Sequence, residues 1–263
     1  MTADLKQARR ARIDAADLVR YALRLGDDAL IGAQRLGEWI AAAPQLEEDV
    51  ALANIALDEL GQARALLSYA GEVEGQGRDE DDLAYLRDER EFVNAQIFEI
   101  PNGDFGRTIA RLLITSAYQV ELYRRLAASA DPTLAAIAAK AVKEVDYHRD
   151  HATSWTLRLG DGTEESHRRM QQGLVDVWPH VGELFESDEL ISRLVHAAVA
   201  VDPATLEEPT MAYLDAVLAQ ATLEQPEASV RHSGGRRGIH TEGMGYLLAE
   251  LQYLHRCHPG ATW

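Results

Sequence analysis

Acidic side chains on helical segments are the residues whose type and spacing point most directly to chemistry. Four-helix bundles that hold two metal ions take one Glu or Asp from each of two helices. Each of the other two helices supplies Glu-x-x-His, because the i, i+3 spacing puts both ligands on one face. In ALANIALDELGQARALLSYA, residues 51–70, Asp58 stands where such a carboxylate would be, and Gly61 follows three residues later. The stretch therefore has the pattern of a metal-binding helix without its imidazole.

Four carboxylates lie at comparable distances from two predicted helical corners, near Gln45 and Asp131. Their side chains are predicted to converge on the interior of a bundle: Asp28, Asp58, Glu121 and Glu144. The nitrogen donors do not accompany them. Tyr147 stands three residues after Glu144, and a neutral phenol is a poor ligand for Fe²⁺ or Mn²⁺.

Three interpretations of these acids stay open. Each acid taken alone is most simply a solvated residue on an exposed helix face. Taken together, the acids form either a buried network neutralised by Lys140 and Arg64, or a metal site that uses His151 one turn further on. We favour the network, because buried carboxylates need partners and the second helix offers no matching nitrogen. The positions interpreted as vestigial metal ligands are Asp28, Asp58, Gly61, Glu121, Glu144 and Tyr147.

Long helical segments position these residues. Apolar residues recur at helical spacing in four long stretches, near 17–43, 47–72, 105–130 and 132–158. About three more helices follow, near 164–186, 205–222 and 240–256. Two tight corners and one long crossover are the connectivity of a ferritin-like four-helix bundle. We therefore predict an all-α fold in which residues 17–263 form one domain and residues 1–16 a flexible N-terminal extension.

The composition excludes several classes of partner. The 263 residues include 43 acidic and 26 basic side chains, for a formal net charge of −17. Such a charge repels nucleic acids and anionic membrane surfaces. The single cysteine, Cys257, fits a reducing compartment. We expect no secretory signal, because no apolar run follows the basic N-terminal residues, and no membrane span, because no stretch approaches ~20 apolar residues. We expect a cytoplasmic protein without nucleic-acid or membrane partners.

A basic glycine-rich segment precedes the last predicted helix. The stretch HSGGRRGIHTEGMGYLLAELQYL places Arg236, Arg237 and His240 ahead of a helix N-terminus. Such a loop can hold a phosphate. The alternative, which we favour, is that these cations pair with acidic groups of this protein or of a partner.

Several long stretches together resemble a known family. The chain is similar to phenylacetate catabolic proteins of the C type, which are components of the multicomponent ring 1,2-phenylacetyl-CoA epoxidases and belong to the ferritin-like superfamily. The stretches that carry the resemblance are LGDDALIGAQRLGEW (25–39), EEDVALANIALDELGQARALLSYA (47–70), GRDEDDLAYLRDEREF (77–92), PNGDF (101–105), KEVDYH (143–148), RLGDGTEESHRRMQ (158–171), GRRGIHTEGMGYLLAE (235–250) and HPGATW (258–263).

The resemblance implies a non-catalytic structural component with no cofactor of its own. Its partner would be the related catalytic epoxidase component of the A type, which holds the di-iron centre and epoxidises the aromatic ring of a CoA thioester. Self-association of the isolated chain and an indirect role in CoA-thioester binding, through Arg236, Arg237 and His240, are further expectations. The alternative is a carboxylate-bridged, metal-dependent oxygenase that is active in its own right.

Overall fold

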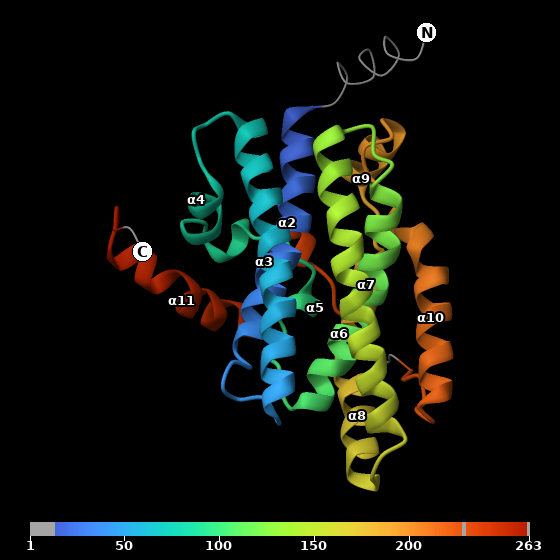
Figure 1. Cartoon of the computed structure of the whole chain (residues 1–263). Coiled ribbons are helices and arrows are strands. Elements are labelled where there is room, and N and C mark those ends of the chain that lie inside the picture. The colour runs from blue at the N-terminus through green and yellow to red at the C-terminus, as the bar shows by residue number, and fades with distance from the viewer. Residues whose placement is uncertain (1–13, 228–229, 262–263) are drawn as a thin grey trace. The chain divides into compact units, whose positions relative to one another are not determined.

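All regular secondary structure in the computed structural model is helical within the residues it describes, 14–227 and 230–261 (Figure 1). The predicted all-α fold is thus confirmed, and no helix in the described ranges has the length and apolarity to cross a bilayer. The α-helices are α2 (Ala15–Gly37), α3 (Leu46–Glu74), α4 (Glu80–Tyr85), α5 (Gln96–Glu99), α6 (Phe105–Leu126), α7 (Pro132–Gly160), α8 (Glu164–Val177), α9 (Glu189–His196), α10 (Glu207–Gln220) and α11 (Glu242–Cys257). The 3₁₀ helices are η1 (Glu89–Glu91), η2 (Trp178–Phe185), η3 (Pro203–Leu206) and η4 (Gly235–Arg237). Of the predicted N-terminal extension, residues 1–13 lie outside the described residues.

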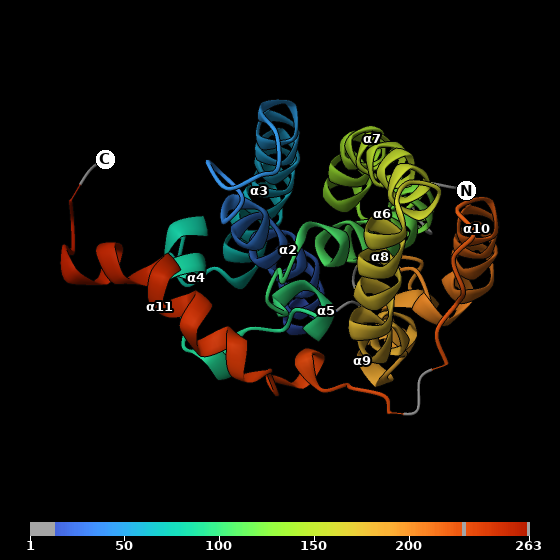
Figure 2. The ribbon, with the colours of Figure 1, turned by 90° about the horizontal axis from the view of Figure 1, so that it is seen from below.

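The first compact unit, called here the first-hairpin unit, comprises the described residues up to 101 and from 233 onward. Its framework is the α2–α3 hairpin, drawn from blue to cyan in Figure 1, whose core includes the fully buried Ile31, Leu52 and Ile55. α4, η1 and α5 occupy the chain between α3 and residue 101. α11 packs against α4 and η1, and Figure 2 shows it beside α4. The first and last parts of the described chain therefore fold together.

The second compact unit, the second-hairpin unit, comprises the described residues from 102 to 232. Its framework is the α6–α7 hairpin, and α8 and α10 pack on both of these helices. Fully buried aliphatic side chains on α6, such as Ile109 and Leu113, form the centre of its core. Two hairpins joined by the crossover through α4 and α5 give the predicted ferritin-like connectivity, followed by the additional helices.

Two helix ends differ from their predicted positions for local reasons. α2 ends at Gly37 rather than near residue 43, and a tight turn follows in which Ala41 has φ 64° and donates its N–H to Asp49 at 2.6 Å. The helix predicted over 164–186 is α-helical to Val177 and continues as 3₁₀. Pro179 lacks the N–H that an α-helical hydrogen bond at that position would need.

Replacing Asp131 with Ala is expected to lower the free energy of unfolding by about 1–2 kcal/mol. The buried Asp131 carboxylate caps α7 by accepting the N–H groups of Thr133 and Leu134, each at 3.0 Å. Asp131→Asn keeps an acceptor in the same place and should lose much less. Urea unfolding at neutral pH measures both variants, and equal losses would contradict the capping role.

Candidate functional site

The first of two adjacent aspartates on α2 is neutralised by an arginine from the crossover. Asp27 is fully buried and accepts hydrogen bonds from both terminal nitrogens of Arg87, with Nη1 3.0 Å from Oδ2. It also accepts the Val93 N–H at 2.9 Å. The Arg87 guanidinium lies over the Phe92 ring, with Cζ 4.2 Å from the ring centroid, where a cation–π attraction adds to the ion pair. Asp27 thereby holds residues 87–93 on α2.

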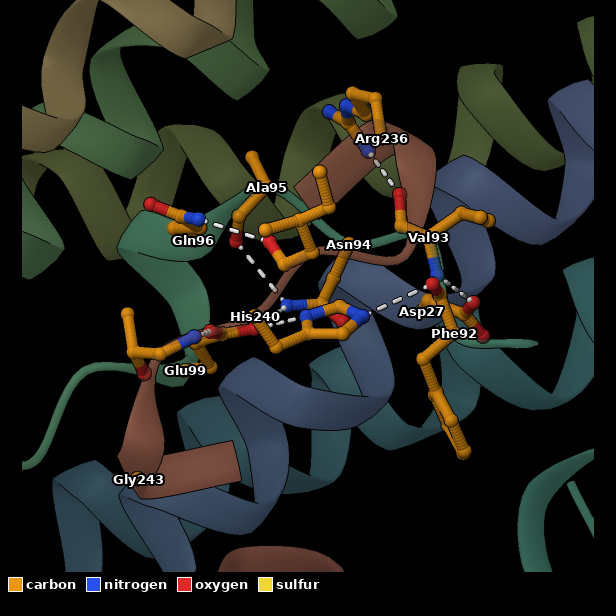
Figure 3. A network of polar contacts seen from close by, with 12 residues as sticks. Asp27, Phe92, Val93, Asn94, Ala95, Gln96, Glu99, Arg236, His240 and Gly243 are labelled. Atoms are coloured by element: carbon orange, nitrogen blue, oxygen red, sulfur yellow. Dashed lines mark hydrogen bonds and ion pairs between the residues drawn. The ribbon is translucent and has the colours of Figure 1, made fainter. Parts of the chain in front are cut away.

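The second aspartate is neutralised from the other end of the chain. The Asp28 carboxylate forms a two-point ion pair with Arg236, with distances of 2.9 Å from Nη1 and 2.7 Å from Nη2, and it accepts the Ala95 N–H at 2.8 Å. Arg236 also donates to the Val93 carbonyl at 3.1 Å (Figure 3). Burial raises the pKa of Asp28 to about 6, although the Arg236 charge and both hydrogen bonds oppose that rise. Desolvation is therefore the largest influence on this carboxyl.

A buried glutamate and histidine form the third ion pair. Glu99 is fully buried, and its Oε2 accepts hydrogen bonds from Asn94 Nδ2 at 2.8 Å and from His240 Nδ1 at 2.6 Å. His240 Nε2 lies 3.0 Å from the Phe92 carbonyl, so both ring nitrogens face acceptors (Figure 3). Burial lowers the pKa of His240, but the hydrogen bond and charge of Glu99, with the Phe92 carbonyl, outweigh it and raise the pKa above 6.5. The imidazolium form satisfies both contacts at once.

Glycines let the segment that carries Arg236 and His240 lie close to the crossover. A Cβ on Gly235 would collide with the Asn94 carbonyl, and one on Gly238 would collide with the Arg90 carbonyl. Gly238 also has φ +74°, in the left-handed region that favours glycine. Arg35 then ties α5 to the start of α11, since it donates to the Glu99 carbonyl at 2.7 Å and to the Gly243 carbonyl at 3.2 Å.

Three residues predicted as contacts for CoA or a partner have different surroundings. The cationic groups of Arg236 and His240 point inward and pair with Asp28 and Glu99. Arg237 is exposed and stays a candidate contact. Arg236 and His240 thus pair with acidic groups of this chain, which is one of the two alternatives considered from the sequence.

On α3 the buried acid is one residue beyond the predicted one. Asp58 and Gly61 are half-buried, whereas Glu59 and Gln62 are 2% and 3% exposed. The Glu59 carboxylate lies against α2. Arg64, which the sequence offered as a counter-ion for Asp58, instead binds Glu80 at 2.9 Å. The inward pair at i, i+3 spacing is therefore Glu-x-x-Gln.

On the second hairpin the predicted acids pair with neighbours on their own helices. Glu121 binds Arg124 at 3.0 Å, and Glu144 binds Lys140 at 3.1 Å, the partner expected from the sequence. Tyr147 is 54% exposed, while the next residue, His148, is fully buried. The buried stripe of α7 is thus again one residue beyond the predicted positions.

The buried pairs at i, i+3 spacing do not fit a carboxylate-bridged iron pair. Such a centre needs a Glu and a His from each of two helices. α3 presents Glu59 and Gln62, and α7 presents Val145 and His148, so each helix lacks one of the two ligands. Across the described part of the chain, no three or more His, Cys, Asp or Glu side chains are grouped so as to hold a metal ion.

Three residues of the buried ion pairs described above were not singled out from the sequence: Asp27, Arg87 and Glu99. The adjacent pair Asp27-Asp28, set in an otherwise apolar part of α2, was the available signal. Two carboxylates there require two cations. Their partners lie 60 and 208 residues away, which no spacing rule identifies.

The fold and the site together define a class of all-helical proteins with ferritin-like connectivity. In this protein, arginine and histidine side chains neutralise the buried carboxylates. The sequence model of the family described as "Phenylacetic acid catabolic protein" matches residues 1–263, and the chain belongs to that family. It is 50% identical over 246 residues to the protein of Escherichia coli (strain K12) that is named as the C component of 1,2-phenylacetyl-CoA epoxidase. The alignment covers 94% of this chain and 99% of the relative.

Arg236→Gln is expected to raise the pKa of Asp28 above its wild-type value of about 6, because the guanidinium opposes the effect of burial. Carbon-13 NMR of the Asp carboxyl groups, with the resonance assigned by its loss in Asp28→Asn, measures the change. Arg237→Gln removes the same charge from the exposed neighbour and should leave this pKa unchanged. An Asp28 resonance that titrates identically in the wild type and in Arg236→Gln would refute the pairing.

His240→Gln is expected to lower the free energy of unfolding by about 1.5–3 kcal/mol at acidic to neutral pH. The folded-state pKa of His240 is raised above 6.5, so the charged pair stabilises the fold fully below pH 6.5. That contribution is lost as the pH rises through the folded-state pKa. Urea unfolding between pH 5.5 and 9 should show the gap between wild type and variant narrowing at high pH, and a widening gap would contradict the assignment.

Proposed function

We propose that this chain is the non-catalytic structural component of a multicomponent phenylacetyl-CoA epoxidase. In this proposal it pairs with the related catalytic di-iron component and stabilises it, while that partner epoxidises the aromatic ring. The observation that carries the proposal is the 50% identity, over 94% of this chain and 99% of the relative, to a protein named as the C component of that enzyme. Identity at this level along nearly all of both chains is the basis for proposing that this chain is a component of such an enzyme.

The donor set supports a component without iron of its own. Gln62 and Val145 stand where an imidazole and a carboxylate would complete the two buried i, i+3 pairs. Asp28 is held by a guanidinium rather than left as a ligand. Iron, in this proposal, belongs to the partner.

The acidic composition and the single cysteine support a cytoplasmic assembly. The net charge of −17 disfavours nucleic-acid and membrane partners, and Cys257 is free and exposed. Self-association of the isolated chain and an indirect contribution of Arg237 to CoA-thioester binding belong to the same proposal.

Co-expression with the di-iron component tests the proposal. We expect a stable complex that epoxidises phenylacetyl-CoA when a reductase is supplied. The chain alone, after anaerobic iron loading, should hold substoichiometric iron and show no turnover.

Two outcomes would contradict the proposal. Failure to co-purify with the di-iron component would rule out the pairing. Binding of about two irons per isolated chain, lost on Glu59→Ala or Glu144→Ala, would favour the carboxylate-bridged oxygenase instead.

A further inference from the structure

α3 carries an apolar stripe on the face opposite its buried side. Leu52 and Ile55 are fully buried on the side of α3 that packs in the first-hairpin unit. The exposed apolar side chains recur at alternating intervals of four and three residues when Ala53 is included. They are Leu46, Val50, Leu57 and Leu60, with exposed fractions of 74%, 52%, 64% and 45%. α3 thus has two apolar faces, and one of them is open to solvent in the described structure.

The spacing of the stripe is that of a helix–helix seam. Intervals of four and three residues keep side chains on one line along a helix, where a second helix can interdigitate with them. An extended strand or an irregular loop has no such repeat. The spacing therefore specifies a helical partner.

The charged residues of α3 that border the stripe between Leu46 and Leu60 are all acidic. Residues 36–63 contain no Lys, Arg or His. On the helix surface Glu47 and Asp58 lie along one edge of the stripe and Asp49 along the other, from their angular positions at 100° per residue. Charges that flank a helical seam select the partner, so an acidic border favours a basic one.

We propose that this face of α3, called the α3 stripe and comprising Leu46, Val50, Ala53, Leu57 and Leu60, docks an apolar helix with Lys or Arg flanks that belongs to a different component of the complex. The inference rests on the proposed function and adds the surface and the chemistry of the partner helix. A second copy of this chain would bring a second acidic border, within a molecule of net charge −17, and is disfavoured.

Leu57→Lys tests the stripe at its centre. A positive side chain there faces a basic partner and removes an apolar anchor, so the Kd for the di-iron component should rise roughly 30-fold or more. Because Leu57 is 64% exposed, the unfolding midpoint should stay close to that of the wild type. Tyr246→Lys, the same change at a 72% exposed site on α11, is the matched control and should leave the Kd unchanged.

Glu47→Lys tests the chemistry of the border at an exposed position. It should slow association and reduce the dependence of the association rate on salt, because opposite charges steer the encounter. An association rate and salt dependence equal to those of the wild type would overturn the basic-flank assignment.

The other outcomes separate this inference from the proposed function. If the wild-type chain does not bind the di-iron component, the proposed function fails. If the wild type binds and Leu57→Lys binds equally well, or Tyr246→Lys weakens binding as much, the stripe assignment fails while the function stands. A dimer of the isolated chain that Leu57→Lys dissociates would overturn the assignment in favour of a second copy.

Discussion

Two adjacent carboxylates buried on one helix impose the constraint on which the first-hairpin unit depends. Consecutive residues on a helix point about 100° apart, and here each carboxylate has a cation of its own. Asp27 receives Arg87 from the crossover, and Asp28 receives Arg236 from beyond residue 233. Each pair joins α2 to a segment distant in the sequence. The unit is therefore assembled around α2 by charge as well as by apolar packing.

These ion pairs contribute more to the position of the chain than to its net stability. Burying two ions costs several kcal/mol per ion, and their mutual attraction often does little more than offset that cost. Removing one partner is far more costly, because it leaves an uncompensated charge. The raised pKa of Asp28 shows that desolvation outweighs even a two-point guanidinium contact. The network thus penalises every arrangement in which residues 233–243 leave the crossover, and this specifies one placement for the segment.

Sequence patterns predicted the elements and missed the contacts, for separable reasons. The helix predicted near 132–158 begins at the observed first residue of α7, Pro132, because capping by Asp131 and the proline ring act locally. The buried stripes of α3 and α7 were assigned one residue too early. On α3, Asp58 and Glu59 are both acidic, and counting forward from a corner at Gln45 could not choose between them. The hairpin turn begins at Gly37, which shifts that count. The ion pair between Lys140 and Glu144 was predictable, because the two residues are one helical turn apart. The long-range pairs were not, because nothing in the sequence around Asp28 identifies a partner 208 residues away.

Neutralisation by arginine has a consequence that neutralisation by a metal lacks. A bound metal makes folding depend on metal supply and on the protonation of its ligands. A guanidinium is part of the chain and stays charged at any pH at which the protein is folded. Because Arg236 reaches Asp28 only when residues 233–241 fold back onto α2, neutralising this acid also fixes the start of α11, which begins at Glu242. Neutralisation of Asp28 and placement of α11 are therefore coupled in the first-hairpin unit. Neither involves the exposed face of α3.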